Sequence, residues 1–403
     1  MQLQTNDRDT GGVSFGFAGK VVVLMGLTIP SYGMFALTPV LPTIAAAFPD
    51  EPNAGLLTRM MVSALGVVVA VASPVIGAVA DRVGARRVLL ASLLIYVLAG
   101  CAPFFLNDLR AIVASRIVFG FGVAAFGAVI MTMLVASSSG AARNRWLGYM
   151  TTVSAVAGVV MYPLAGFVGG FGWRWTFLTY AVGLVFLLLA FVGFPADPPR
   201  AGATKAANKA SQPARFTLGT PIGHIVFALL AGAALMSPLV YVPFRARELG
   251  VTDSNVIGAL LMTGAAASII SAAAYGWIRS RLSIGETFVL GFAVLASGAA
   301  VLGAAQSLSL LFVGKALIGM GLSVTSPNLF ALGAVAGPDA YRARTIGFTK
   351  SGIYGGPILA QLILEPVLTH TSFAFAFGVI SLACMALALA NAWQAFSRRR
   401  ALA

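Results

Sequence analysis

Long apolar stretches follow one another along this chain, with only short polar breaks between them. A helix needs roughly 20 apolar residues to cross the hydrocarbon core of a bilayer. The pattern therefore predicts an all-α membrane protein with twelve transmembrane helices. The runs lie near residues 18–46, 57–79, 88–106, 110–137, 147–170, 174–194, 217–243, 255–278, 285–305, 309–336, 345–368 and 372–393.

The longest polar stretch, rich in Pro, Ala and Lys, separates the sixth run from the seventh. We therefore expect an N-terminal six-helix bundle over residues 1–194 and a C-terminal six-helix bundle over residues 217–403. A cytoplasmic linker over residues 195–216 joins them in this interpretation.

The two halves repeat each other at a single offset of 199 residues. Hydropathy alone would not match Gly with Gly or Arg with Arg, so the repeat indicates a duplication. Duplicated six-helix units build one large class of secondary transporters, which rock two halves around a site between them. Channels and membrane enzymes can also be duplicated, so the repeat alone does not separate them from a transporter. The sequence motifs are needed for that distinction. The offset pairs Pro39 with Pro238, Gly77 with Gly276, Arg82 with Arg281, Arg116 with Lys315, Gly120 with Gly319, Gly122 with Gly321, Arg143 with Arg342, Arg145 with Arg344 and Gly148 with Gly347.

Composition excludes several classes of protein. Only 9% of the residues are charged and 59% are hydrophobic, whereas soluble domains carry roughly 25% charged residues. The chain is therefore neither a soluble enzyme nor a disordered protein. The two cysteines, Cys101 and Cys384, lie inside apolar runs, where we expect buried hydrophobes rather than redox or metal chemistry.

The net charge of +14 comes from Lys and Arg gathered in every second break. No run alternates basic and aromatic residues as a nucleic-acid surface would. An excess of Lys and Arg marks cytoplasmic loops, so we expect both termini in the cytoplasm. The first run is too long for a signal-peptide core and predicts an uncleaved helix of a plasma-membrane protein, in the bacterial inner membrane. The basic residues assigned to the outer side are Arg59, Arg110, Arg174, Arg245 and Arg247.

The break after the second run reads Gly77-Ala-Val-Ala-Asp81-Arg82-Val-Gly84-Ala-Arg86-Arg87. It resembles the loop signature of the major facilitator superfamily, Gly-x-x-x-Asp-Arg-x-Gly-x-Arg-Arg, at every defining position. Gly77 and Asp81 share a helix face, and a carboxylate at a helix C-terminus is favourable only beside the start of another helix. We therefore expect a latch in which Asp81 caps the eleventh helix. Alternatively, the arginines act as topology signals only. The latch residues are Gly77, Asp81, Arg82, Gly84, Arg86 and Arg87.

The fourth run contains Arg116-Ile-Val-Phe-Gly120-Phe-Gly122-Val-Ala124, which resembles a second signature of that family, Arg-x-x-x-Gly-x-Gly-x-Ala. A lone Arg in a membrane helix costs about 2.5–3.5 kcal/mol on insertion scales. We expect Arg116 to line a cavity, with snorkelling to the outer interface as the alternative. Both interpretations stay open for Lys315, and we expect Lys350 to reach the cytoplasm.

The fifth run contains Gly158-Val-Val-Met-Tyr162-Pro163-Leu-Ala-Gly166-Phe167. This resembles the signature of the drug–proton antiporter branch, Gly-x-x-x-Gly-Pro-x-x-Gly-Gly, although Tyr162 and Phe167 replace glycines. Trp173-Arg174-Trp175-Thr-Phe177 and Pro39-Val-Leu-Pro42 are also typical of that branch. The resemblance implies an exporter coupled to protons, and helix packing alone is the alternative explanation. The residues expected to shape packing are Gly120, Gly122, Gly158, Pro163 and Gly166.

None of the twelve acidic residues lies in the middle of an apolar run. We expect Glu365, near the outer end of the eleventh helix, to be a solvated carboxylate rather than a proton carrier. A cation in a low-dielectric cavity needs a countercharge, so Arg116 and Lys315 favour a neutral or anionic substrate. Each further candidate lining residue could equally be hydrogen-bonded between helices. These candidates are Ser31, Tyr32, Met161, Tyr162, Ser237, Tyr241, Thr325, Ser326 and Asn328.

The sequence thus predicts a secondary active transporter, a monomer that moves a small organic solute across the lipid bilayer by alternating access. Proton-coupled efflux of a neutral or anionic compound is the leading expectation. The alternatives are an uptake permease or uniporter for an organic anion, and a non-transporting membrane receptor or scaffold. We expect no cofactor, metal site, enzymatic activity or nucleic-acid partner, because the isolated His and Cys residues form no ligand cluster and no phosphate-binding loop is present.

Overall fold

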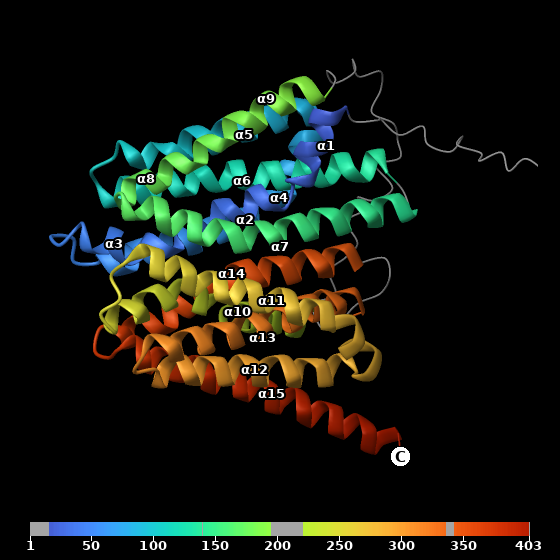
Figure 1. Cartoon of the computed structure of the whole chain (residues 1–403). Helices are drawn as coiled ribbons and strands as arrows, with labels where there is room; N and C mark the ends of the chain where they lie inside the picture. Colours follow the sequence, from blue (N-terminus) through green and yellow to red (C-terminus); the bar gives the residue numbers. More distant parts are fainter. Residues whose placement is uncertain (1–15, 139, 195–220, 336–341, 403) are drawn as a thin grey trace, which may run out of the picture.

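The computed structural model describes residues 16–138, 140–194, 221–335 and 342–402. Within these ranges every regular element is a helix, and the long helices lie side by side (Figure 1). The all-α prediction is confirmed. The expected linker over residues 195–216 lies outside the described residues.

The first membrane segment is broken into four short helices. Pro39 and Pro42 stand in the first turns of the last two pieces, where the missing N–H of proline is tolerated but interrupts a continuous helix. The pieces are α1 (Phe17–Leu24), α2 (Thr28–Phe35), η1 (Thr38–Val40) and α3 (Leu41–Ala46). The remaining helices of the first half are α4 (Ala54–Val83), α5 (Ala85–Cys101) with η2 (Ala102–Phe104), α6 (Leu109–Ser137), α7 (Gly140–Gly170), α8 (Trp173–Leu178), η3 (Thr179–Val182) and α9 (Gly183–Gly193).

The helices of the second half are less interrupted, and side chains cap several of their starts. Ser283 and Glu286 form a reciprocal capping box at the start of α12, which satisfies two otherwise unpaired N–H groups. Asp253 caps α11 in a similar way. The helices are α10 (Pro221–Glu248), α11 (Ser254–Arg281), α12 (Ile284–Ala304), α13 (Leu308–Val335), α14 (Arg342–Leu368) and α15 (Phe373–Leu402).

Eleven segments of the described chain are long and apolar enough to cross a membrane. The twelfth expected segment, α14, has 27 residues but is not among them; Gln361, Glu365 and two prolines stand among its apolar residues. It packs along α10 and α4, parallel to the other long helices (Figure 1). Neighbouring helices therefore cover the most polar segment of the set.

The offset of 199 residues found in the sequence also relates positions in space. A Cβ placed on Gly122 would lie 2.9 Å from Tyr96 N and 3.0 Å from Ser92 O. A Cβ placed on Gly321 would lie 2.9 Å from Leu295 N and 3.0 Å from Gly291 O, and each of these residues is 199 positions further along. The same close helix approach, which only small residues allow, is therefore built twice.

The helices of the first half lie on one side of the molecule and those of the second half on the other (Figure 1). Between them α4 packs against α14 and α7 packs against α11. The offset maps α4 onto α11 and α7 onto α14, so these two contacts are equivalents of each other. We call the end of the molecule where α4 begins the Arg59 end, and the end where α4 gives way to α5 at Gly84 the Arg86 end.

Candidate transport pathway and its closure

Arg116 is enclosed by side chains of the first half, with 1% of its surface exposed. Its Nη2 donates to the carbonyl oxygen of Gly33 at 3.0 Å and to the hydroxyl of Tyr180 at 3.4 Å. Its guanidinium carbon lies 3.9 Å from the ring centre of Phe119 and 4.9 Å from that of Tyr180, which adds cation–π stabilisation. Arg116 thus supports the end of α2, where the first segment breaks. A role in binding substrate stays a prediction.

Lys315 holds the equivalent position in α13, but its surroundings differ. It is 6% exposed and lies against α11, where a Cβ on Gly264 would be 2.8 Å from its Cε and 3.1 Å from its Nζ. Among the described residues no hydrogen bond or ion pair reaches its Nζ. A larger residue at position 264 would collide with the aliphatic part of the Lys315 side chain.

A small cavity of about 40 Å³ lies between α2 and α7, well below the roughly 300–1,000 Å³ of sites that hold small organic molecules. It brings together Tyr32 and Tyr162 from the two helices, with Ser31, Met161 and Gly158 beside them. None of its lining residues is charged. Four candidate lining residues named from the sequence therefore meet at one place.

A smaller space lies on the other side of Phe35, between the two halves. It is lined from α2 and α4 by residues that include Met34 and Gly66, and from α10 and α14 by residues that include Met236 and Tyr354. The two spaces share Phe35, so the α2–α7 cavity reaches the boundary between the halves.

Other candidate lining residues have structural contacts instead. Asn328 is fully buried and its Nδ2 donates to Ile284 O at 2.9 Å, joining α13 to the start of α12. Ser237 donates to Ala233 O within α10 and faces an apolar groove between α10, α14 and α15. Tyr241 is fully buried beside the Arg59 end. Their roles in binding substrate stay predictions.

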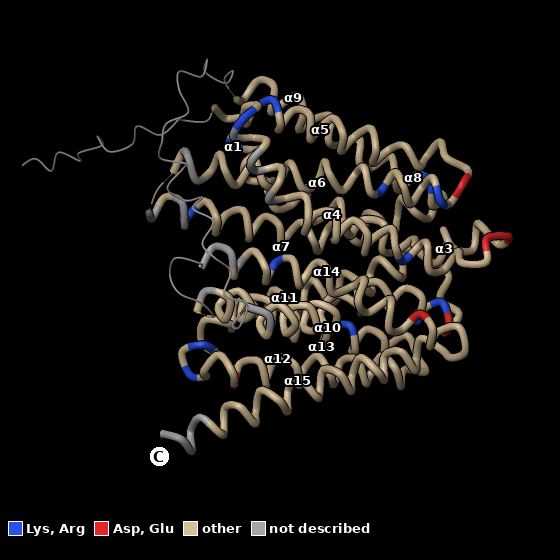
Figure 2. The backbone as a smooth tube through the Cα atoms, turned by 180° about the vertical axis from the view of Figure 1, so that it is seen from behind, with Lys and Arg blue, Asp and Glu red and all other residues tan. Residues whose placement is uncertain are grey.

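The latch motif is only partly described. The backbone of Gly77 and Asp81 lies in α4, and their side chains are outside the described residues, so the latch stays a prediction. Gly84 has a φ of 115° between α4 and α5, a conformation that favours glycine. Arg86 Nη2 donates to Phe191 O at 2.8 Å and so ties the start of α5 to α9. The charged residues gather mainly at the two ends of the helices (Figure 2).

The contact between α4 and α14 contains residues that the sequence did not bring together. Arg59 forms an ion pair with Glu365, and their side chains are 6% and 19% exposed. One turn deeper, Gln361 Nε2 donates to Ser63 Oγ at 2.7 Å. The expected outer-surface arginine and solvated carboxylate are therefore a pair that joins the two halves. Arg59 and Glu365 are 306 residues apart, so no local sequence pattern indicates that they form a pair.

The equivalent contact between α7 and α11 is made by glycines. A Cβ on Gly166 would lie 3.2 Å from the Cα of Gly258, and a Cβ on Gly258 would lie 2.7 Å from Tyr162 O. Gly166 thus packs at the boundary between the halves, as its motif suggested. Gly158 has nothing within 4 Å of its Cβ position and lines the cavity instead. Pro163 stands inside α7.

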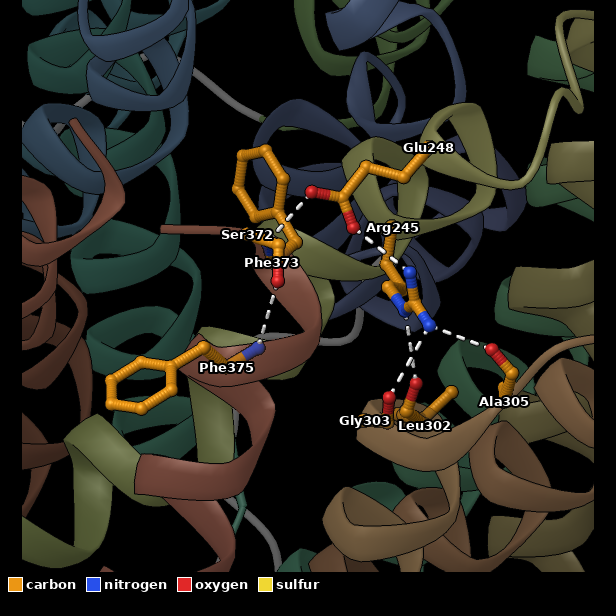
Figure 3. Close-up of polar contacts among 8 residues, drawn as sticks. All are labelled: Arg245, Glu248, Leu302, Gly303, Ala305, Ser372, Phe373 and Phe375. Atoms are coloured by element: carbon orange, nitrogen blue, oxygen red, sulfur yellow. Dashed lines mark hydrogen bonds and ion pairs between the residues drawn. The ribbon is translucent and has the colours of Figure 1, made fainter. Parts of the chain in front are cut away.

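Two further arginines assigned to the outer surface bind backbone carbonyl groups at the Arg59 end. Arg247 Nη1 donates to Pro42 O at 2.7 Å across the halves. Arg245 reaches the last carbonyls of α12, with Nη2 2.6 Å from Ala305 O, and pairs with Glu248 at 2.9 Å (Figure 3). Glu248 in turn accepts from Phe373 N at the start of α15. Arg245 and Glu248 thus cap helix ends, and Arg247 ties α10 to α3 of the first half.

The sequence model of the Major Facilitator Superfamily matches residues 23–360. The chain therefore belongs to this family of membrane transporters and is not an enzyme. It is a multi-pass membrane protein.

Several relatives are resistance proteins. The chain is 29% identical over 376 residues to the chloramphenicol resistance protein of Streptomyces lividans, covering 85% of this chain and 92% of that protein. It is 30% identical over 185 residues to the multidrug resistance protein B homolog of Mycobacterium tuberculosis, covering 41% of this chain and 34% of that protein. The chain thus matches about a third of the length of the mycobacterial relative.

Solved structures share the fold at low identity. A D-xylose–proton symporter superposes with a TM-score of 0.75 at 16% identity, covering 94% of this chain and 97% of that one. The inward-open xylose transporter XylE from E. coli gives a TM-score of 0.69 at 14% identity, covering 92% and 94%. This likeness establishes the helix arrangement alone.

Proposed function

We propose that the protein is a proton-coupled exporter of a small, neutral, partly aromatic compound. The observation that carries the proposal is the uncharged cavity between α2 and α7, which combines Tyr32 and Tyr162 with Ser31 and Met161. Aromatic rings and hydroxyl groups suit a neutral organic solute, and a cationic drug would need a countercharge there. The near full-length match to a chloramphenicol resistance protein supports export rather than uptake.

Transport by alternating access fits the arrangement of the two halves. We assign residues 1–194 and 217–403 to two bundles that rock as units, and the Arg86 end to the cytoplasm on the basis of its Lys and Arg content. The contacts through Arg59 and Gly258 hold the halves together at the Arg59 end, and the contact of Gly66 with Tyr354 continues to the central space. Opening must then occur at the Arg86 end, where a cytoplasmic substrate would enter.

Everted membrane vesicles test the direction and the coupling together. With the vesicle interior more acidic than the outside, so that protons leave as the solute enters, vesicles containing the protein should accumulate radiolabelled chloramphenicol, and an uncoupler should abolish the accumulation. Tyr32→Ala should weaken the uptake, because it removes one wall of the cavity, while Gly148→Ala should not, since its Cβ position is free of neighbours. Accumulation in right-side-out vesicles instead would identify an uptake permease. No movement of any tested solute would favour a receptor or scaffold.

A further inference from the structure

Arg59 reaches out of α4, past Gly55 of the same helix, into a socket whose aromatic rings and carboxylate all belong to the second half. Its guanidinium carbon lies 5.0 Å from the ring centre of Phe244, 5.4 Å from that of Phe373 and 6.0 Å from that of Tyr241. Glu365 of α14 pairs with it. The whole residue is 5% exposed. An arginine anchored among aromatic rings is the kind of side chain that dominates the energy of an interface.

A second bond continues the same line of contact. Ser63 is one turn beyond Arg59 on α4, and Gln361 is one turn before Glu365 on α14. Their hydrogen bond of 2.7 Å is buried, with the two residues 1% and 4% exposed. Two turns from Arg59, a Cβ on Gly66 would lie 2.7 Å from Tyr354 O. The contact therefore runs from the Arg59 end to the central space that Gly66 and Tyr354 line.

The chemistry of these groups suits a contact that breaks and forms again. Inside the protein the two charges neutralise each other through Arg59 Nη2 and Glu365 Oε1, while Arg59 Nε and Glu365 Oε2 are buried without a hydrogen-bond partner among the described residues. Removing one residue would leave the other charge buried. When the helices separate, both side chains can be hydrated at the membrane surface. Their positions on opposite halves mean that neither half can rotate away without breaking the pair.

We propose that Arg59, Glu365, Ser63 and Gln361 form the gate that closes the Arg59 end of the transport pathway. Arg59 is the moving part, and the socket of Tyr241, Phe244 and Phe373 receives it. This inference rests on the proposed alternating access. It does not depend on which solute is carried or on whether protons drive the transport.

Solvent accessibility of the central space tests the gate without any substrate. Met236 lines that space, and Met236→Cys in a background of Cys101→Ala and Cys384→Ala supplies a single thiol. A membrane-impermeant maleimide is added to the Arg59 side of right-side-out vesicles, and the labelling rate is measured. We expect slow labelling with the gate intact and a rate at least about tenfold higher with Arg59→Ala or with Glu365→Gln, since each tenfold corresponds to about 1.4 kcal/mol. Exchanging the charges by combining Arg59→Glu with Glu365→Arg should restore slow labelling.

Arg110→Ala is the matched control. Arg110 also lies at the Arg59 end and pairs with Glu51 at 3.2 Å, but both belong to the first half and the arginine side chain is 72% exposed. Its loss should leave the labelling rate unchanged. The gate is refuted if Arg59→Ala and Glu365→Gln both leave labelling slow, or if Arg110→Ala raises it equally.

A reversible cross-link provides the converse measurement. In the same background, oxidised Ser63→Cys/Gln361→Cys should hold the Arg59 end closed and block transport, and reduction should restore it. Transport that continues with the cross-link formed would overturn the gate. A protein that labels as expected but carries none of the tested solutes would instead contradict the proposed function.

Discussion

The two contacts between the halves occupy equivalent positions but are built from different residues. Arg59 of α4 and Glu365 of α14 correspond, through the offset of 199 residues, to Gly258 of α11 and Gly166 of α7. One contact is an ion pair and the other brings two glycine backbones together. An ion pair has directed bonds that water can replace, whereas a glycine contact depends on surfaces that fit. Closure of the Arg59 end therefore relies on an ion pair between α4 and α14 and on close surface fit between α7 and α11.

Gly258→Val should have the largest effect on transport. Its side chain would meet the carbonyl oxygen of Tyr162, which lies 2.7 Å from the Cβ position. Overpacking costs about 1–3 kcal/mol, so transport in vesicles should fall by about tenfold or more. Gly148→Ala, whose Cβ position has no neighbour within 4 Å, is the control in α7. Normal transport by Gly258→Val would show that the glycine contact does not need its close fit.

Arg59→Ala should have the next largest effect, and its loss of stability should depend on whether Glu365 is still present. Alone it leaves Glu365 unpaired, and breaking a buried pair costs about 3–5 kcal/mol, less here because 19% of the Glu365 side chain is exposed. Combining Arg59→Leu with Glu365→Leu should recover most of the loss, because no charge is then left alone. The melting temperature of the purified protein in detergent measures both. Equal losses for the single and double variants would mean that the two charges are not coupled.

Gln361→Leu should have the smallest effect. It removes one hydrogen bond to Ser63, and such a bond contributes about 0.5–1.5 kcal/mol. The melting temperature should fall slightly, and adding Ser63→Ala should lower it no further, since the unpaired hydroxyl is removed as well. A loss as large as that of Arg59→Ala would place the main closing bond at Gln361 instead of at the ion pair.

The sequence predicted the features that repeat. The glycines Gly122 and Gly321 matched at the offset, and the structure places both against equivalent backbone atoms. The tyrosines Tyr32 and Tyr162, which do not repeat at the offset, line one cavity, and their role in binding substrate stays a prediction. Each of these residues was singled out from its own helix, without knowing which helices are neighbours in the fold.

The gate residues could not be predicted in this way, because the repeat does not conserve them. Arg59 has a glycine at its equivalent position, and so does Glu365, so the offset gives no reason to pair them. Each lies near a helix end, where a charge can always be assigned to solvent. A glycine motif in α14, Gly352-Ile-Tyr-Gly-Gly-Pro357, matches the motif of α7 at an offset of 194, whereas the contacts through Gly166 and Glu365 follow 199.

Two equivalent carbonyl groups, one in each half, show how far the halves have diverged. The oxygen of Leu106, after α5, accepts from Arg174 of α8, and the oxygen of Ala305, at the matching place after α12, accepts from Arg245 of α10. Position 373, which matches Arg174, holds Phe373, and Ala46 matches Arg245. Each copy thus acquired its own donor from a different neighbour. A chimaera that exchanged the third segments, α5 with η2 for α12, would leave an arginine at each carbonyl group. A chimaera that exchanged the sixth segments, α8 to α9 for α15, would move Arg174 to the second half. The carbonyl group at position 106 would then have no arginine, and the one at position 305 would have two.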